Sequence, residues 1–104
     1  MRWIRILQQA AEETTEAAAW YESERAGLGT EFAQAIDAAI DLLEQDIVPL
    51  TAMPGVAGAR GAKRLLLRRF PYDIIVRESS EAIMIVAVAH HSRRPGYWRS
   101  RLRS

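Results

Sequence analysis

Residues 82–89, which read AIMIVAVA, are the stretch that decides the fold. This run is nearly all apolar, so it predicts a strand in the middle of a sheet, buried on both faces. The polar residues 78–81 predict a hairpin turn before it, and the apolar run 74–76 predicts the preceding strand. Such a sheet needs helices over one face and a second cover over the other.

Upstream of these strands the sequence predicts a further strand and a loop. Residues 64–70 contain three consecutive leucines and predict a strand, and Pro71 marks a bulge or a strand junction after it. The prolines and glycines of residues 48–62 predict a loop, of a length that often belongs to a binding surface. Residues 2–7 mix arginine with branched and aromatic side chains and predict the first strand.

Two helices are predicted between the first strand and the loop. Residues 8–26 lack proline and glycine and are rich in alanine and glutamate, which favours a helix that ends at Gly27. A second helix follows Thr30 as its N-cap, with apolar side chains recurring every three or four residues. These are Phe32, Ile36, Ile40, Leu43 and Ile47. A four-residue connection makes the two helices an antiparallel hairpin.

The predicted fold class is α+β with the order β-α-α-β-β-β. It consists of an N-terminal strand, a two-helix hairpin and a C-terminal antiparallel three-stranded meander that packs on the hairpin. The 104 residues fit one domain, 1–104. No apolar run approaches the ~20 residues that span a bilayer, and the N-terminus lacks the layout of a signal peptide. We therefore expect a cytoplasmic protein without a membrane contact.

The composition also limits the chemistry. The chain has no cysteine, which excludes disulfides and thiolate zinc sites. Motifs of serine nucleophiles, P-loops and dinucleotide-binding folds are absent. The adjacent His90 and His91 point to opposite faces of a strand and have no acidic residue near them in sequence. We therefore expect neither a metal nor a cofactor.

The charge is divided between the two parts of the chain. Residues 1–59 have three arginines against ten acids, a net charge of −7, whereas residues 60–104 have eleven basic residues against three acids, a net charge of +8. Thirteen of the fourteen basic residues are arginine, whose planar guanidinium suits phosphate or carboxylate. This polarity predicts a cationic sheet surface for an anionic partner, with nucleic acid as the first candidate. An Arg-rich codon usage with an ordinary solvated surface gives the same composition. The residues assigned to the nucleic-acid- or target-binding surface are Arg60, Lys63, Arg68, Arg69, Arg94, Trp98 and Arg99.

Residues 90–99, HHSRRPGYWR, gather groups that suit chemistry on a phosphodiester. Histidine exchanges protons near neutral pH, and aromatic rings stack on unpaired bases. A metal-free reaction needs a base for a ribose 2′-hydroxyl, arginines for the charged phosphorane and an acid for the leaving oxygen. Structural roles fit the same stretch, with His90 hydrogen-bonded at a strand end and Trp98 in the core.

Five segments together resemble the RelE/ParE superfamily of type II toxins. They are residues 17–22, 27–29 with Phe32, 64–72, 86–90 and 94–98. The similarity extends from Ile4 to Arg101 and implies a small α+β toxin with a cognate antitoxin as its partner in a hetero-oligomer. RelE-like members cut messenger RNA in the ribosomal A site, whereas ParE-like members poison DNA gyrase.

The resemblance also implies which residues would be catalytic in a RelE-like nuclease. These are Arg64, His91, Arg93 and Tyr97. His91 stands where an arginine is expected, and Leu66 and Asp73 stand where two further basic residues are expected. This incomplete set favours a growth-arresting, plasmid-stabilisation-like toxin with DNA gyrase as its target. The alternatives are a ribosome-dependent mRNA endoribonuclease and a degenerate antitoxin-binding protein without toxicity.

Overall fold

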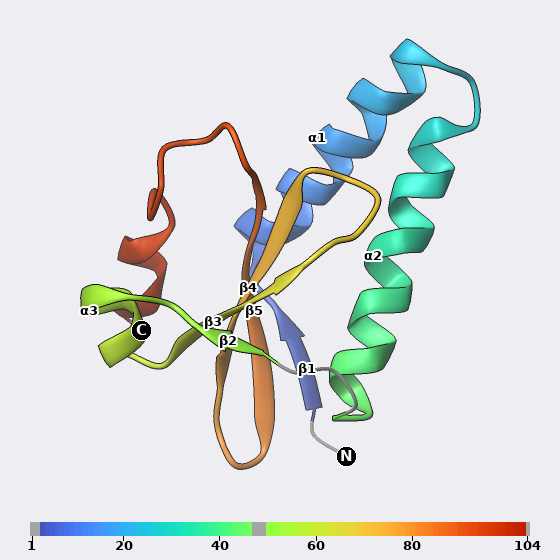
Figure 1. The fold of residues 1–104 in the computed structure, drawn as a ribbon. Coiled ribbons are helices and arrows are strands. Elements are labelled where there is room, and N and C mark those ends of the chain that lie inside the picture. Colours follow the sequence, from blue (N-terminus) through green and yellow to red (C-terminus); the bar gives the residue numbers. More distant parts are fainter. Residues whose placement is uncertain (1–2, 47–49, 104) are drawn as a thin grey trace.

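A five-stranded sheet in the order β1-β5-β4-β3-β2 forms the middle of the molecule (Figure 1). The computed structural model describes residues 3–46 and 50–103. The elements are β1 (Trp3–Ile6), α1 (Gln8–Glu24), α2 (Leu28–Glu44), β2 (Thr51–Ala52), α3 (Gly55–Ala59), β3 (Ala62–Leu66), β4 (Tyr72–Glu78), β5 (Ala82–His90) and the 3-10 helix η1 (Arg99–Arg103). β1 is parallel to β5, and the other neighbours are antiparallel. The predicted order is confirmed, with β2 and α3 added inside the predicted loop.

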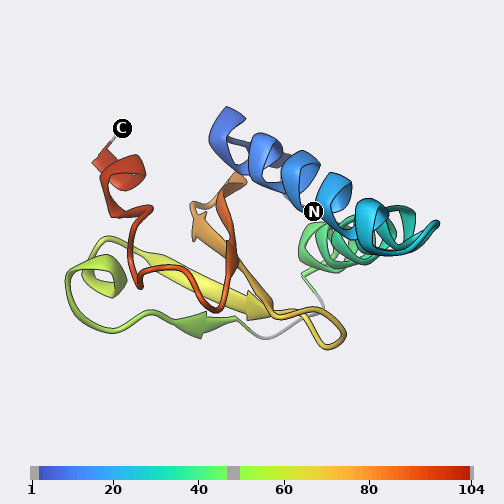
Figure 2. The same ribbon diagram turned by 90° about the horizontal axis from the view of Figure 1, so that it is seen from above.

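β5 is buried on both faces, as its apolar run predicts. Ile83, Ile85 and Val88 belong to the core under α1 and α2, whereas Val86 and Ala87 belong to a second core on the opposite face. Figure 2 shows α1 and α2 together on one side of the sheet and α3 far from them. Each face of the central strand therefore has its own cover.

A β-bulge in β5 sets the direction of the side chains after it. Ile75 pairs with Ala87 and Val76 pairs with Ile85, so Val86 is the extra residue. A bulge shifts the alternation of side chains along a strand by one position. His90, paired with Tyr72, consequently lies on the side of the helices.

The helical hairpin is closed by a contact that the sequence did not predict. Glu22 of α1 accepts hydrogen bonds from the backbone N–H groups of Gly27, at 2.8 Å, and Gly29, at 3.0 Å. These bonds satisfy N–H groups that the start of α2 leaves free. α2 therefore begins at Leu28, and the prediction of Thr30 as its N-cap is wrong. Of the apolar residues predicted for this helix, Ile47 lies outside the described residues.

The second core lies under α3 and the C-terminal segment. Trp98 is 3% exposed and packs there with Ala57, Ile75 and Leu102. Arg77 of β4 holds the segment by donating a hydrogen bond from Nη1 to the carbonyl of Leu102 at 2.7 Å. None of the described helices is both long and apolar enough to cross a membrane.

Candidate functional site

A pocket of about 390 Å³ lies where the C-terminal segment crosses the ends of β3, β4 and β5. We call it the cationic pocket. Its lining includes Arg64, Leu66, Asp73, His91, Arg93, Arg94 and Tyr97. All four predicted catalytic residues line this pocket, although β3 and the C-terminal segment are far apart in sequence.

Asp73 holds the imidazole of His91 in one orientation. His91 Nε2 lies 2.9 Å from Asp73 Oδ1, and the Asp73 side chain is only 14% exposed. A carboxylate accepts hydrogen bonds, so Nε2 carries the proton of the neutral ring and Nδ1 keeps its lone pair. His91 is exposed and lines the cationic pocket, and among the described residues its Nδ1 has no hydrogen-bond partner. The pair has the form of a base with an orienting carboxylate.

Three arginines contribute to the positive charge of the cationic pocket. Arg64 Nη1 lies 3.8 Å from Asp73 Oδ2, so its charge is partly balanced within the protein. Arg93 is stacked 4.0 Å from the centre of the Tyr97 ring. Arg94 is exposed and has no ion pair among the described residues. Arg93 and Arg94 therefore remain available to an anion.

The hydroxyl of Tyr97 is bonded to α1. It donates a short hydrogen bond to Glu13, which also accepts from Arg101 Nη1 at 3.0 Å. Burial raises the pKa of Tyr97 well above its usual range, and the bond to Glu13 raises it further. In this arrangement the tyrosine holds its proton, and the hydroxyl faces Glu13.

Glu13 and Arg101 also complete the outer edge of β5. β1 pairs with this edge only as far as Ile85. Beyond it, Glu13 accepts from the N–H of Val88 at 3.1 Å, and Arg101 donates to the carbonyl of Val86 at 3.1 Å. Two side chains thus satisfy backbone groups that another strand would otherwise pair.

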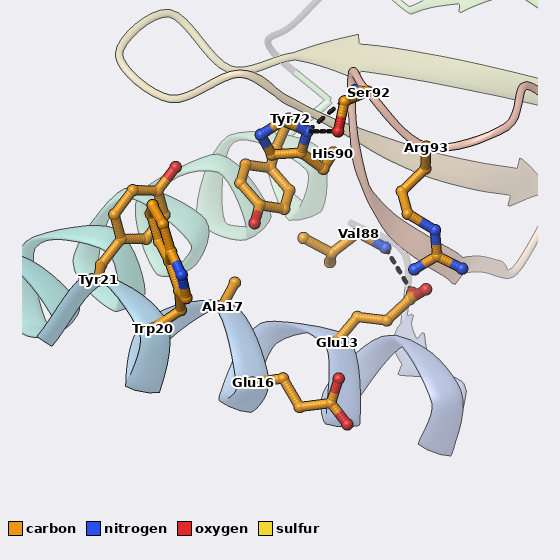
Figure 3. Close-up of a pocket in the computed structure, with 10 residues that line it drawn as sticks. All are labelled: Glu13, Glu16, Ala17, Trp20, Tyr21, Tyr72, Val88, His90, Ser92 and Arg93. Atoms are coloured by element: carbon orange, nitrogen blue, oxygen red, sulfur yellow. Dashed lines mark hydrogen bonds between the residues drawn. The ribbon is translucent and has the colours of Figure 1, made fainter. Parts of the chain in front are cut away.

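A second pocket of about 310 Å³ lies between α1 and the end of β5 (Figure 3). We call it the aromatic pocket. Its lining is Glu13, Glu16, Ala17, Trp20, Tyr21, Tyr72, Val88, His90, Ser92 and Arg93. His90 and Arg93 line both pockets, so the two hollows adjoin at the end of β5.

The other predicted binding residues do not form one cationic sheet surface. Lys63 and Arg64 lie on opposite faces of β3, as strand geometry requires. Lys63 Nζ is 2.6 Å from Glu78, and Arg69 Nη2 is 2.6 Å from Glu31. The hydrogen bond from Arg69 lowers the pKa of Glu31. Part of the charge of the basic half is thus balanced within the protein.

The remaining predicted residues are also dispersed. Arg60 follows α3 and Arg68 lies between β3 and β4, and both are exposed. Arg99 donates from Nε to the carbonyl of Gly96 at 3.2 Å. Trp98 is a core residue that also lines the cationic pocket. Within residues 3–46 and 50–103, no three histidine or carboxylate side chains are grouped to hold a metal ion.

The sequence interpretation did not identify Glu13 as a site residue, and it placed Asp73 only as a departure from the nuclease pattern. Glu13 lies among several acids on α1, and its contact with Arg101 joins residues 88 positions apart. No local pattern signals such a contact. The position of Asp73 could have been predicted, because side chains alternate along a strand and Asp73 therefore lies on the same face of β4 as Ile75.

The architecture is similar to that of two solved structures. A chain of the chromosomal ParDE TA system from P. aeruginosa superimposes with a TM-score of 0.74 and 17% identity, over 86% of this chain and 96% of that one. A point mutant of YafQ from E. coli superimposes with a TM-score of 0.61 and 12% identity, over 88% of this chain and 96% of the other. No protein-family model and no curated protein matches the sequence. The chain therefore has a RelE/ParE-like fold, as the resemblance predicted.

Proposed function

We propose that this protein is the growth-arresting toxin of a type II toxin–antitoxin pair and that it cuts RNA in the cationic pocket. The likeness to a ParDE chain over most of both chains supports the toxin class. The contact between His91 and Asp73, with two arginines beside it, carries the assignment of the chemistry. A cognate antitoxin in the cytoplasm is the partner that this class requires.

In the proposed reaction His91 acts as the general base. Its Nδ1 takes the proton of a ribose 2′-hydroxyl, and the 2′-oxygen attacks the adjacent phosphorus. Arg93 and Arg94 stabilise the additional negative charge on the phosphorane. The bond from phosphorus to the 5′-oxygen then breaks, leaving a 2′,3′-cyclic phosphate and a 5′-hydroxyl. Water supplies the proton of the leaving oxygen, because the Tyr97 hydroxyl is bonded to Glu13, and the hydroxide that remains takes the proton from His91.

Induced expression in a bacterium that lacks the antitoxin tests this proposal. Cut messages and a rapid loss of protein synthesis support RNA cleavage. The variant His91→Ala should cut about 10²–10⁴-fold more slowly, which is the usual effect of losing one proton-transfer group. Ser100→Ala, an exposed change in the C-terminal segment, is the control and should cut as wild type does. Equal rates for His91→Ala and wild type would exclude His91 as the base.

DNA gyrase is a second candidate target. The ParDE chain superimposes with a higher TM-score than YafQ does, and Leu66 is 58% exposed where a nuclease would have a basic residue. Filamentation and a DNA-damage response, with intact messages, would favour gyrase over RNA. Normal growth at confirmed expression would favour a protein that binds the antitoxin without being toxic.

The affinity for the antitoxin should depend on the salt concentration. A partner segment with acidic residues would meet Arg93 and Arg94 at the cationic pocket. Attraction between exposed charges is screened by salt, so the affinity should fall as the salt concentration rises. An affinity that does not change with salt would instead indicate that apolar burial dominates the complex.

A further inference from the structure

The aromatic pocket has no role in the proposed reaction. We propose that it takes an unpaired nucleobase of the same RNA strand whose phosphate lies in the cationic pocket. This inference rests on the proposed function, and it adds a subsite for the substrate on the other side of β5.

The shape and lining of the aromatic pocket suit a flat ring. Trp20 and Tyr21 stand at one end of the pocket and Arg93 at the other, with the small side chain of Ala17 between them (Figure 3). Trp20 is 58% exposed although it is one of the largest apolar side chains. Its ring meets Tyr21 edge to face, with centroids 5.1 Å apart. Exposed rings of this kind stack on bases without regard to their sequence.

His90, which lines the aromatic pocket, supplies a polar group for the polar edge of a base. The N–H of Ser92 donates to His90 Nδ1 at 2.9 Å, so Nε2 of the neutral ring carries the proton. Among the described residues this Nε2 has no hydrogen-bond partner. His90 therefore offers a donor to the carbonyl or ring nitrogen of a base. An apolar peptide side chain would leave that donor without a partner.

The position of the pocket points to a nucleic acid more than to a protein segment. The bulge at Val86 places His90 on the helix side, and the next residue, His91, lines the cationic pocket. Arg93 lines both pockets. An RNA strand that crosses the end of β5 would thus meet phosphate-binding groups on one side and stacking groups on the other. A polynucleotide presents phosphates and bases in this way.

Binding of a short RNA that resists cleavage tests the inference. The probe is a single-stranded tetranucleotide with 2′-O-methyl groups, which removes the nucleophile of the proposed reaction, together with copies lacking one base. Trp20→Ala should raise the Kd about 5- to 150-fold, from the usual loss of one stacked base. Trp3→Ala is the matched control, since Trp3 is 79% exposed on β1, and its Kd should not change.

A second measurement guards against a folding defect. Stacking quenches indole fluorescence, so the probe should quench wild type and Trp3→Phe but not Trp20→Phe, which keeps an aromatic ring. Removing one base from the probe should raise its Kd for the wild-type protein and leave its Kd for Trp20→Ala unchanged. Circular dichroism spectra of all variants should superimpose on wild type.

Three outcomes would overturn the inference. In the first, the wild-type protein does not bind the probe. In the second, Trp20→Ala binds the probe as tightly as wild type does. In the third, Trp20→Ala binds the antitoxin more weakly but binds the probe with unchanged affinity. The last result would make the pocket a protein-docking site. If RNA is cut while Trp20→Ala binds normally, the proposed function stands and the base subsite falls. If no RNA is cut but probe binding depends on Trp20, the subsite stands and the cleavage proposal falls.

Discussion

Replacing Glu13 with alanine should destabilise the whole domain. Its carboxylate pairs with Arg101, and the two side chains are 14% and 16% exposed. Removal of one partner from a buried pair costs about 3–5 kcal/mol, because the other charge stays buried. We expect about 3 kcal/mol, the lower end, since Arg101 keeps its bond to the carbonyl of Val86. For a domain of this size that lowers the Tm by about 12–24 °C.

Thermal and urea unfolding followed by circular dichroism measure this loss. Glu16→Ala is the control on the same helix, because Glu16 is exposed one turn further on, and it should change stability by less than about 0.5 kcal/mol. Glu13→Gln should fall between the two, because its single amide oxygen can still accept from the N–H of Val88, while its NH2 group can donate to the Tyr97 hydroxyl. A Glu13→Ala variant as stable as the Glu16→Ala control would refute the reasoning.

Three further predictions concern stability. Gly29→Ala should cost about 1–3 kcal/mol, because its Cβ would lie 2.4 Å from the carbonyl oxygen of Ala18, and unfolding in urea that matches wild type would show that the hairpin relaxes. Glu22→Ala should cost about 0.5–2 kcal/mol by removing the cap of α2, against no change for the exposed Glu24→Ala in the same assay. The raised pKa of Tyr97 favours its neutral form in the folded state, so stability should fall as the pH rises above 10.0 towards the folded pKa, and Tyr97→Phe should make this decline shallower in denaturation curves recorded between pH 8 and 12.

The fold was largely predictable because its signals are local. The apolar run of β5, the period of α2 and the turn at 78–81 each follow from neighbouring residues, and all three are confirmed. The parallel pairing of β1 with β5 was not predicted, since it joins segments almost 80 residues apart. The bulge was also missed, because an all-apolar strand gives no alternation that would show a shift at Val86.

The candidate site was predictable in its residues but not in their partners. The cluster after β5 identified His91, Arg93 and Tyr97, and the structure brings them to one pocket with Arg64. Their roles as catalytic residues remain predictions. The balance of Lys63 and Arg69 by carboxylates depends on tertiary contacts, so counting charges along the chain overstated the cationic surface.

The parallel pairing of the first and last strands has a consequence for synthesis. β1 leaves the ribosome first, but its partner residues in β5 follow nearly 80 positions later. At about 5–20 residues per second that is an interval of about 4–16 s, and Arg101 emerges later still. Both pockets include Arg93, so neither is complete until that residue has left the ribosome, several seconds after β1. Under the proposed function, an antitoxin present during translation therefore has these seconds to bind the polypeptide before it can cut RNA.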